Sequence, residues 1–275
     1  MSGATLDRRA RSTGPADDET PREPPTVLVR LDAADPSRRR RLWARRVAAW
    51  TGARHTLASR FASTSELLDV AAKREMRWIV SGLAGEAGAT TTPAIDGDLG
   101  LLVRRAPGPV LIVQPWAPAP PPAAAAAVVG VDRSDESRAA AWAVARLLTP
   151  SGAGGGRARL ILAHGCTQHP AELAVHTKWS RLVDVMRVER HPWMTALARE
   201  LRAPGLDVDL VARPRWAPEL ISGLARRMDA TLVGLGASSR VEGRRARVGH
   251  IHRHILLGTP CPVLIATPAA RARGR

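Results

Sequence analysis

Small residues and polar donors follow an apolar run near the end of the sequence, and this arrangement suits phosphate binding. The run at residues 231–233 favours a β-strand and passes directly into a turn of small residues. Glycines in such a turn let the backbone approach a phosphate, while the N-terminus of a following helix supplies N–H groups and the positive end of its dipole. The candidate contacts are Gly234, Gly236, Ala237 and Ser238 in the turn, and Gly249 and His250 at the start of the expected helix.

The neighbouring histidines and the two cysteines are the other residues with reactive side chains. On a helix, His250 and His254 share one face, which is the spacing of a two-histidine metal site. No carboxylate or cysteine stands at a local position for a third ligand. Cys166 has no adjacent histidine and acid to activate it, and Cys261 lies between two prolines ahead of an apolar run. We therefore expect no catalytic residue and no dedicated metal site.

Alternating strands and helices must position these residues. Short β-prone runs separated by stretches of helical periodicity are typical of a parallel α/β sheet. A capping box at Ser63 and Glu66 marks one of the helix starts. We expect strands at residues 26–31, 54–61, 78–80, 110–113, 128–132, 159–163, 208–212, 231–233 and 263–266, and helices at about 36–49, 64–75, 99–104, 135–148, 218–228 and 249–257. Residues 168–202 should be mostly helical but broken near Pro192, because proline fits the start of a helix and not its interior.

Two parts of the sequence match each other at constant offsets, which indicates an internal repeat. The offset is 100 residues around the first strand of each part and 153 residues towards the end of each part. Because the offset grows by 53 residues, the second part contains a strand and a long helical segment that the first part lacks. The matches include Asp32, Asp35, Ser37 and Arg38 with Asp132, Asp135, Ser137 and Arg138, and Pro107, Pro109 and Val110 with Pro260, Pro262 and Val263.

The repeat predicts two doubly wound parallel-sheet α/β domains, of which the first lacks one strand-helix unit. A Pro/Ala stretch separates them, and proline favours an extended, semi-rigid linker. The expected organisation is a disordered N-terminal tail at residues 1–25, a shortened domain at 26–116, the linker at 117–125, a full domain at 126–268 and a basic tail at 269–275.

The last part of the chain resembles the universal stress protein family, whose nucleotide-binding signature is Gly-x2-Gly-x9-Gly-Ser/Thr before a Pro-Cys-Pro-Val strand. Gly234 matches the first glycine, and Gly249 stands at the family's distance from Cys261. Ala237 occupies the place of the second glycine, the following loop is two residues longer, and His250 replaces the hydroxyl residue. The resemblance implies an adenine-nucleotide α-hydrolase-like architecture, in a tandem form that carries both members of a domain pair on one chain.

The resemblance also implies a function. In nucleotide-binding members the aspartate at the position of Asp132 sits near the adenosine, so the second domain is expected to bind ATP or a related adenine nucleotide, with Mg²⁺ only where the nucleotide brings it. The corresponding helix start of the first domain carries Asp96 and Asp98, which would repel a phosphate. The expected role is a non-catalytic regulator of a stress response. The alternatives are a nucleotide-independent protein interaction module of the same fold and an enzyme that cleaves adenine nucleotides, and weak hydrolysis stays open.

Composition limits the partners and the compartment. The formal net charge of +16 would suit a phosphate backbone, but the arginine clusters are not interleaved with aromatic residues that stack on bases. We therefore expect a protein partner or self-association as a dimer, and no nucleic acid. The sequence has no run of about 18 apolar residues, and its two cysteines form no disulfide framework. A cytoplasmic protein without a membrane contact is the expectation.

Overall fold

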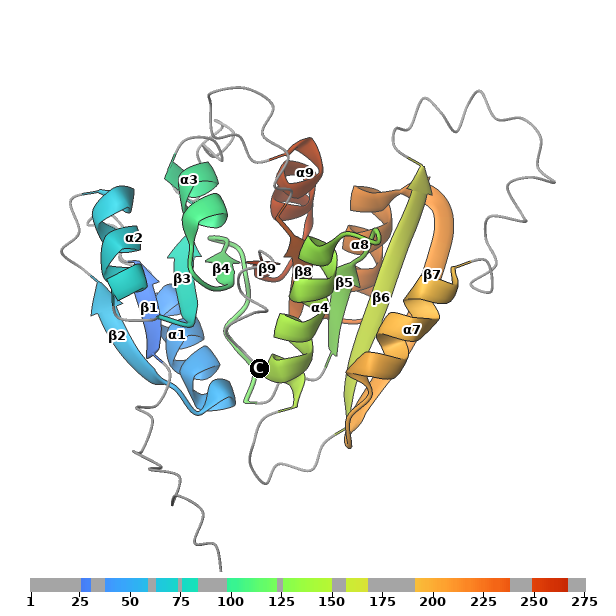
Figure 1. Cartoon of the computed structure of the whole chain (residues 1–275), viewed down its shortest axis with the longest axis horizontal. Coiled ribbons are helices and arrows are strands. Elements are labelled where there is room, and N and C mark those ends of the chain that lie inside the picture. The colour runs from blue at the N-terminus through green and yellow to red at the C-terminus, as the bar shows by residue number, and fades with distance from the viewer. Residues whose placement is uncertain are drawn as a thin grey trace, which may run out of the picture.

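The computed structural model describes residues 26–30, 38–58, 63–73, 76–83, 98–122, 126–149, 157–167, 191–237 and 249–266. Strands and helices alternate within these segments (Figure 1). The strands are β1 (Thr26–Arg30), β2 (Arg54–Ala58), β3 (Trp78–Gly82), β4 (Val110–Val113), β5 (Ala126–Gly130), β6 (Ala158–Thr167), β7 (Leu206–Trp216), β8 (Leu232–Gly236) and β9 (Val263–Ala266). The helices are α1 (Arg38–Thr51), α2 (Thr64–Lys73), α3 (Asp98–Arg105), α4 (Asp135–Leu148), α7 (Pro192–Leu201), α8 (Ala217–Arg227) and α9 (His250–Gly258).

The described strands form one sheet in the order β2-β1-β3-β4-β9-β8-β5-β6-β7. Neighbouring strands are parallel, except that β4 and β9 pair antiparallel with Leu111 opposite Leu264. The sheet therefore consists of a first half, β1 to β4, and a second half, β5 to β9, whose last strands meet in the middle. Within the described segments, the first half has no strand in the place that β7 takes in the second. The α/β fold class expected from the sequence is confirmed.

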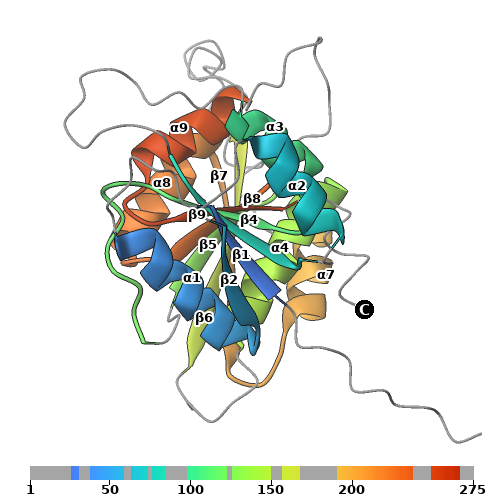
Figure 2. The same cartoon turned by 90° about the vertical axis from the view of Figure 1, so that its left-hand side faces the viewer.

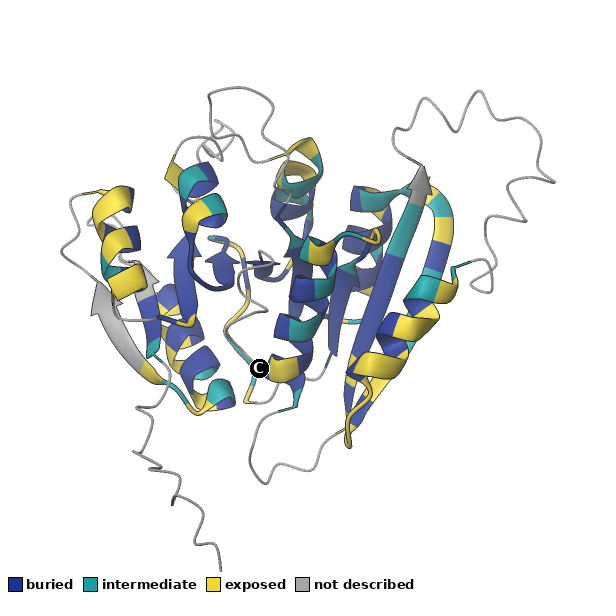
Figure 3. Ribbon diagram, in the orientation of Figure 1, coloured by how far each residue is buried: buried dark blue, intermediate teal, exposed yellow. Residues whose placement is uncertain are grey.

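Helices cover both faces of the sheet (Figure 2). On one face α1, α4 and α7 bury their apolar side chains against the strands, and on the other face α2, α3, α8 and α9 do so. The inner strands are buried while the helices expose their outer sides (Figure 3). Every residue of β3, β4 and β9 is buried, as their short continuous apolar runs predict for strands that are covered on both faces.

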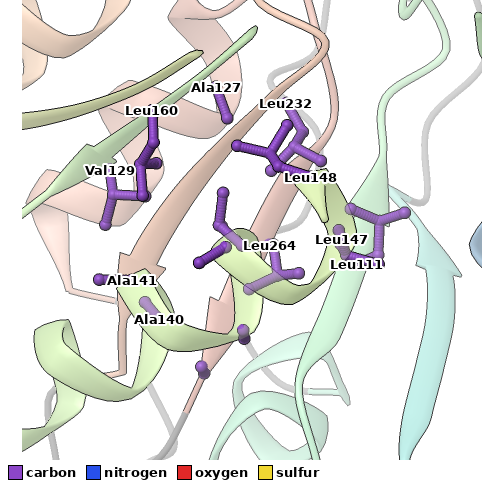
Figure 4. Packing of buried hydrophobic residues seen from close by; sticks show 14 of the residues in the cluster. Leu111, Ala127, Val129, Ala140, Ala141, Leu147, Leu148, Leu160, Leu232 and Leu264 are labelled. Carbon is purple, nitrogen blue, oxygen red and sulfur yellow. The ribbon is translucent and has the colours of Figure 1, made fainter. Parts of the chain in front are cut away.

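Helix α4 packs over the junction between the two halves. Its inner side is built of alanines and leucines, and small side chains let a helix lie close to the strands beneath it. Leu147 and Leu148 of this helix lie near Leu111 of β4 and Leu264 of β9 (Figure 4). All four side chains are buried in the same cluster. One apolar core therefore spans the antiparallel pair that joins the halves.

Two strands are longer than the apolar pattern predicts. The pattern gives about five residues to each, whereas β6 has 10 residues and β7 has 11. The two strands pair with each other along their length, with an irregularity between Gly165 and Thr167. Because β7 lies at the edge of the sheet, it accommodates polar residues and Pro214 that a central strand would not. Backbone pairing, which the pattern does not show, sets the ends of both strands.

The proline-rich segment at residues 115–122 lies along α1, where Figure 2 shows it passing the helix. Side chains of α1 donate hydrogen bonds to backbone carbonyls of the proline-rich segment. Those carbonyls are available because a proline-rich chain is extended and forms no internal backbone hydrogen bonds. The bonds run from Arg39 to Pro115 O, from Trp43 Nε1 to Pro118 O (2.9 Å), and from Arg46 (3.0 Å) and Trp50 (3.4 Å) to Pro122 O.

Some sequence-based expectations fall outside the described segments. Helix α7 begins at Pro192 and confirms the last part of the mostly helical segment expected at 168–202, but residues 168–190 are not described. The predicted tails at 1–25 and 269–275 are not described either. The proposed domain boundaries stay a prediction, because both halves contribute to one sheet.

Candidate functional site

Strands β5 and β8 lie side by side and parallel, and the chain leaves them in opposite directions. From β5 it passes through α4 to β6, and from β8 through α9 to β9 on the other side. Ligands of open α/β sheets bind outside the carboxyl ends of the strands at such a switch point. Asp132 follows β5, Ala237 follows β8 and Gly249 precedes α9 at this edge. Ser238 and the rest of the loop up to residue 248 lie outside the described segments.

Asp132 is held at the start of α4 by a small hydrogen-bond network. The backbone N–H of Ser134 donates to Asp132 Oδ1 at 3.2 Å, and the Ser134 hydroxyl donates to the same oxygen. The N–H of Asp132 donates to Ser137 Oγ at 3.3 Å. Arg133 adopts a φ of 68°, in the left-handed region that residues other than glycine rarely enter. This turn places an exposed, oriented carboxylate at the switch point.

The two turn glycines serve packing between β8 and α4. A Cβ on Gly234 would lie 2.7 Å from Val144 Cγ2, and a Cβ on Gly236 would lie 2.3 Å from the backbone nitrogen of Ser137. Both distances are far below van der Waals contact, so any side chain would push α4 away from the strand. The glycines bring the first turn of α4, and with it Asp132, against the end of β8.

Ala237 is part of the sheet and the core. Its N–H donates to the carbonyl oxygen of Ala266 at 2.8 Å, and only 5% of its surface is exposed. The amide is therefore already paired and does not face a ligand. A phosphate at this edge would have to be held by other groups than the N–H of Ala237.

His252 bridges α9 to the end of β8, a contact that the sequence did not single out. Its Nε2 lies 2.7 Å from the carbonyl oxygen of Gly236, so Nε2 donates and carries the proton of the neutral ring. Burial lowers the pKa of His252, opposed by the hydrogen bond to Gly236 and by the charge of Asp132. The only signal in the sequence was the alternation of His250, His252 and His254, which does not show which ring turns inward.

Gly249 and His250 start α9 in different surroundings. Gly249 is the N-cap, is exposed and has no side chain to cap the first turn. The ring of His250 stacks on Trp216 at the end of β7, with centroids 6.4 Å apart and planes 14° apart. His254, one turn on, meets the same indole edge to face at 4.6 Å. His250 and His254 therefore share one face, as their spacing predicts, but an indole and not a metal site occupies it.

A cluster of rings stands next to Asp132 at the end of β6. His164 Nδ1 lies 2.8 Å from Val131 O, and its ring meets those of His191 at 5.1 Å and Trp193 at 5.3 Å. The guanidinium of Arg133 lies 5.7 Å from the centroid of Trp193. Burial lowers the pKa of His164, opposed by the bond to Val131 and by Asp132, while His191 and Arg133 lower it further. A neutral His164 keeps Nε2 free to accept a hydrogen bond.

The structure thus brings Asp132, Gly236, His252 and His164 to one edge and leaves the ring of His250 on Trp216. Recognition of hydroxyl groups and planar rings is the chemistry that an oriented carboxylate and aromatic side chains support. No group of three or more metal-ligating side chains occurs within the described segments. In the first half, Asp98 begins α3 with an exposed carboxylate, while Asp96 lies outside the described residues.

Two further features lie apart from this edge. Burial raises the pKa of the Cys261 thiol to about 12, so this side chain is an inert part of the core. A hollow lined by residues that include Arg159, Arg202 and Asp209 lies where β6 and β7 begin, at the opposite edge of the sheet from the switch point.

Comparison with known proteins identifies the second half most clearly. Residues 126–267, just over half of the chain, match the model of the universal stress protein family. No curated protein is significantly similar to the chain. None of the described helices is long and apolar enough to cross a bilayer.

Two solved structures from Pseudomonas aeruginosa resemble nearly the whole chain. One, from strain UCBPP-PA14 and assigned to the universal stress proteins, is 16% identical with a TM-score of 0.54, and the match covers 90% of this chain and 96% of the other. The second, described as a functionally unknown protein from strain PAO1, is 18% identical with a TM-score of 0.53, and the match covers 91% and 95% of the two chains. At these identities the likeness shows the fold alone.

Proposed function

Because the chain belongs to the universal stress protein family, we propose that its second half binds an adenine nucleotide where β5 and β8 end. The observation that carries the proposal is the exposed Asp132 carboxylate, oriented by Ser134 at the switch point of the sheet. A carboxylate accepts hydrogen bonds from the hydroxyl groups of a ribose. The adjacent rings of His164 and Trp193 offer apolar faces for a base.

The start of α9 is the proposed phosphate position. Gly249 contributes no side chain to the first turn, and no described side chain caps it, so the leading N–H groups of α9 could bind an anion, which the helix dipole favours. A Cβ at Gly249 would meet only His252 Nδ1, at 3.5 Å. Magnesium is expected only as the counterion of a bound nucleotide.

ATP titration of the purified chain by calorimetry tests this proposal. Asp132→Ala removes the ribose acceptor and should weaken binding by about 10-fold or more, the usual effect of losing a hydrogen bond to a charged group. Gly249→Asp should weaken it similarly through repulsion of the phosphate. Asp is itself a favourable N-cap residue, so this second variant should keep or raise thermal stability, which separates lost binding from lost folding.

Asp69→Ala is the matched control, since this carboxylate is exposed on α2 in the other half of the molecule. It should bind ATP like the wild type. If the wild type and both site variants bind ATP equally poorly, the nucleotide proposal is wrong.

A second candidate function is a nucleotide-independent interaction module of the same fold. It is supported by the turn itself, where the N–H of Ala237 pairs with Ala266 and the carbonyl of Gly236 pairs with His252. The N–H of Ala237, a donor that a phosphate loop would use, is here paired within the protein, and His252 ties the adjacent carbonyl to α9. If this function is correct, the protein does not bind ATP but associates with itself or with a protein partner. Light scattering across a concentration series measures the self-association.

We further propose that the protein acts as a regulator without turning the nucleotide over. Within the described segments no group of three or more metal-ligating side chains adjoins the Asp132 carboxylate, which supports this role. An assay of phosphate release tests this point. If the wild type hydrolyses ATP and Asp132→Ala does not, the regulator proposal is wrong and the protein is an enzyme.

A further inference from the structure

Strand β7 is the last strand at one side of the sheet, and no other strand of the described segments pairs with its outer edge (Figure 1). The carbonyl oxygen of Gly205, just before β7, accepts a bond from the N–H of Ala158 on β6 at 2.9 Å. Backbone groups point to alternate sides along a strand, so the odd-numbered residues of β7 bond to β6 and the even-numbered ones face outward. The N–H and C=O groups of Val208, Leu210 and Ala212 therefore lie at the outer edge.

Contacts of the residues on β7 show that this edge is open in the described structure. Arg213 Nη1 donates to Ala212 O at 3.3 Å, so a side chain of the same strand covers a carbonyl that a neighbouring strand would use. Val208, Leu210 and Val211 pack against the core but are only half-buried (Figure 3). Unpaired backbone groups beside half-exposed apolar side chains form a template on which a further strand can pair.

The charged residues of β7 are arranged symmetrically, with opposite signs, about Val211. Asp207 and Asp209 precede Val211 by four and two residues, and Arg213 and Arg215 follow it by two and four. Two identical strands that pair antiparallel about a two-fold axis at Val211 therefore place each aspartate opposite an arginine of the other copy. Charges on an edge strand normally hinder pairing between copies, but in this arrangement the charges that meet have opposite signs.

We propose that two copies of this chain associate through β7, with the two strands antiparallel and centred on Val211. Leu210 of one copy then lies opposite Ala212 of the other, and these residues exchange backbone hydrogen bonds. The odd-numbered residues form the pairs that share no hydrogen bond, in which the side chains lie closest. Asp209 of one copy meets Arg213 of the other in such a pair, and Val211 meets its own copy on the axis.

The outer charges belong to a less regular part of the strand. The pairing of β7 with β6 becomes irregular after Arg213, so the regular ladder between two copies also ends near this residue. Arg215 lies beyond that point and reaches Asp207 of the other copy through its long side chain. The central pair of Asp209 with Arg213 therefore defines the register.

The existing ion pair of Asp209 is compatible with this interface. Its Oδ2 lies 2.5 Å from Nε of Arg159 on β6. The two side chains are 44% and 56% exposed, so this pair contributes little stability by itself. A carboxylate has two oxygens that accept several hydrogen bonds, so Asp209 can bind Arg159 and an arginine of a second copy together.

The inverted order of charges is the reason to propose a second copy as the occupant. A strand of a different protein or of another part of the chain would complement β7 only if it carried the same pattern. The strand at the other edge of the sheet, β2, contains no acidic residue and lacks this self-complementarity. Strand β6 separates β7 from β5, so the proposal does not rest on nucleotide binding, which the ATP titration tests separately.

Sedimentation velocity of the full-length chain over a series of concentrations tests the proposal. The wild type should show a reversible equilibrium between monomer and dimer, because pairing along one strand edge buries little area. The double variants Asp207→Arg, Asp209→Arg and Arg213→Asp, Arg215→Asp each bring like charges together. Each should raise the dissociation constant of the dimer about 10-fold or more.

An equimolar mixture of the two double variants is the decisive sample. In a mixed dimer every arginine again lies opposite an aspartate, so the mixture should associate like the wild type although each variant alone does not. Arg41→Asp with Arg45→Asp is the matched control, since it makes the same change in charge at exposed positions on α1. This control should associate like the wild type, and thermal melting checks that all the variants are folded.

A single cysteine on the axis tests the register. In a Cys166→Ser background, Val211→Cys should form a covalent dimer on mild oxidation, because directly opposite residues of this kind have Cα atoms about 4.5 Å apart. Val208→Cys should not, since it lies three residues from the axis and its copy is about 20 Å away. Cys261 is buried and should not react.

Three results would overturn the proposal. The first is a wild type that stays monomeric at every concentration, whatever else occupies the edge. The second is association that both double variants retain, or that the α1 control loses as fully as they do. The third is a mixture of the double variants that fails to associate, or equal cross-linking of Val208→Cys and Val211→Cys.

Discussion

His252 shows how one side chain decides the character of the candidate site. Its Nε2 donates to Gly236 O at 2.7 Å, so the end of β8 is tied to the first turn of α9. From the sequence, His250 was the histidine expected to face the candidate site, because it directly follows Gly249. The rotation of α9 about its axis turns His252 inward and His250 onto Trp216, and that rotation depends on packing against α8 and the sheet.

The neutral state of His252 predicts a pH dependence of stability. Burial lowers its pKa in the folded protein, so the unfolded chain binds a proton more readily. The contribution to stability is complete above about pH 6.5, the ordinary value for histidine, and is lost as the pH falls below it. Urea unfolding at a series of pH values should therefore show a free energy of unfolding that decreases between about pH 7.5 and 5.

In His252→Gln the amide can still donate to Gly236 O, but it does not titrate, so the decrease should be smaller. His164, whose pKa burial also lowers, should supply part of the remainder. His254→Gln is the matched control on the same helix, at an exposed position. An unchanged pH dependence in His252→Gln would contradict this account.

Among the elements, those bounded by local signals were predictable from sequence. Helix α4 was predicted with the bounds that the structure shows, and in the structure Ser134 caps its start. Strands β4 and β9 were also predicted, each preceded by a proline and read as a short apolar run. The purpose of Gly234 and Gly236 was not predictable, because the atoms that exclude a side chain there belong to α4 and β5, about a hundred residues earlier.

Substitution of Gly236 tests this packing role. Gly236→Ala would place a Cβ against the backbone of Ser137 and Glu136, so α4 must shift and the free energy of unfolding should drop by about 1–3 kcal/mol. Gly223→Ala is the contrasting change, because the nearest atom to its Cβ is Arg227 Nη1 at 4.0 Å. In the middle of α8 it should stabilise the protein by up to about 1 kcal/mol. Denaturant titrations compare the two, and an unchanged stability in Gly236→Ala would contradict the packing role of this glycine.

On the scale of the whole molecule, the two halves share a core as well as a sheet. Leu111 and Leu264 face each other across the antiparallel pair. Gln114, after β4, is buried and donates from Nε2 to Leu256 O at 3.2 Å and to Thr259 Oγ1 at 3.3 Å, both at the end of α9. The sequence repeat predicted two similar units, and only the structure shows these contacts between them.

Shared packing predicts that the halves unfold together. Leu111→Ala leaves a cavity at a fully buried position and should reduce the free energy of unfolding by about 2–5 kcal/mol in one transition. Leu42→Ala, at an exposed position on α1, should cost much less. Circular dichroism and tryptophan fluorescence measure the transition, and coincident curves indicate cooperativity. Two separated transitions in the wild type would show that the halves are independent.

The antiparallel pairing of β4 with β9 within one polypeptide also fixes the stoichiometry of the two halves. Their association does not depend on protein concentration, so dilution cannot dissociate them as it dissociates a dimer of separate subunits. A symmetric dimer of identical chains repeats every substitution in both subunits. In this chain a substitution in one half is not repeated in the other, so the two halves can acquire different functions.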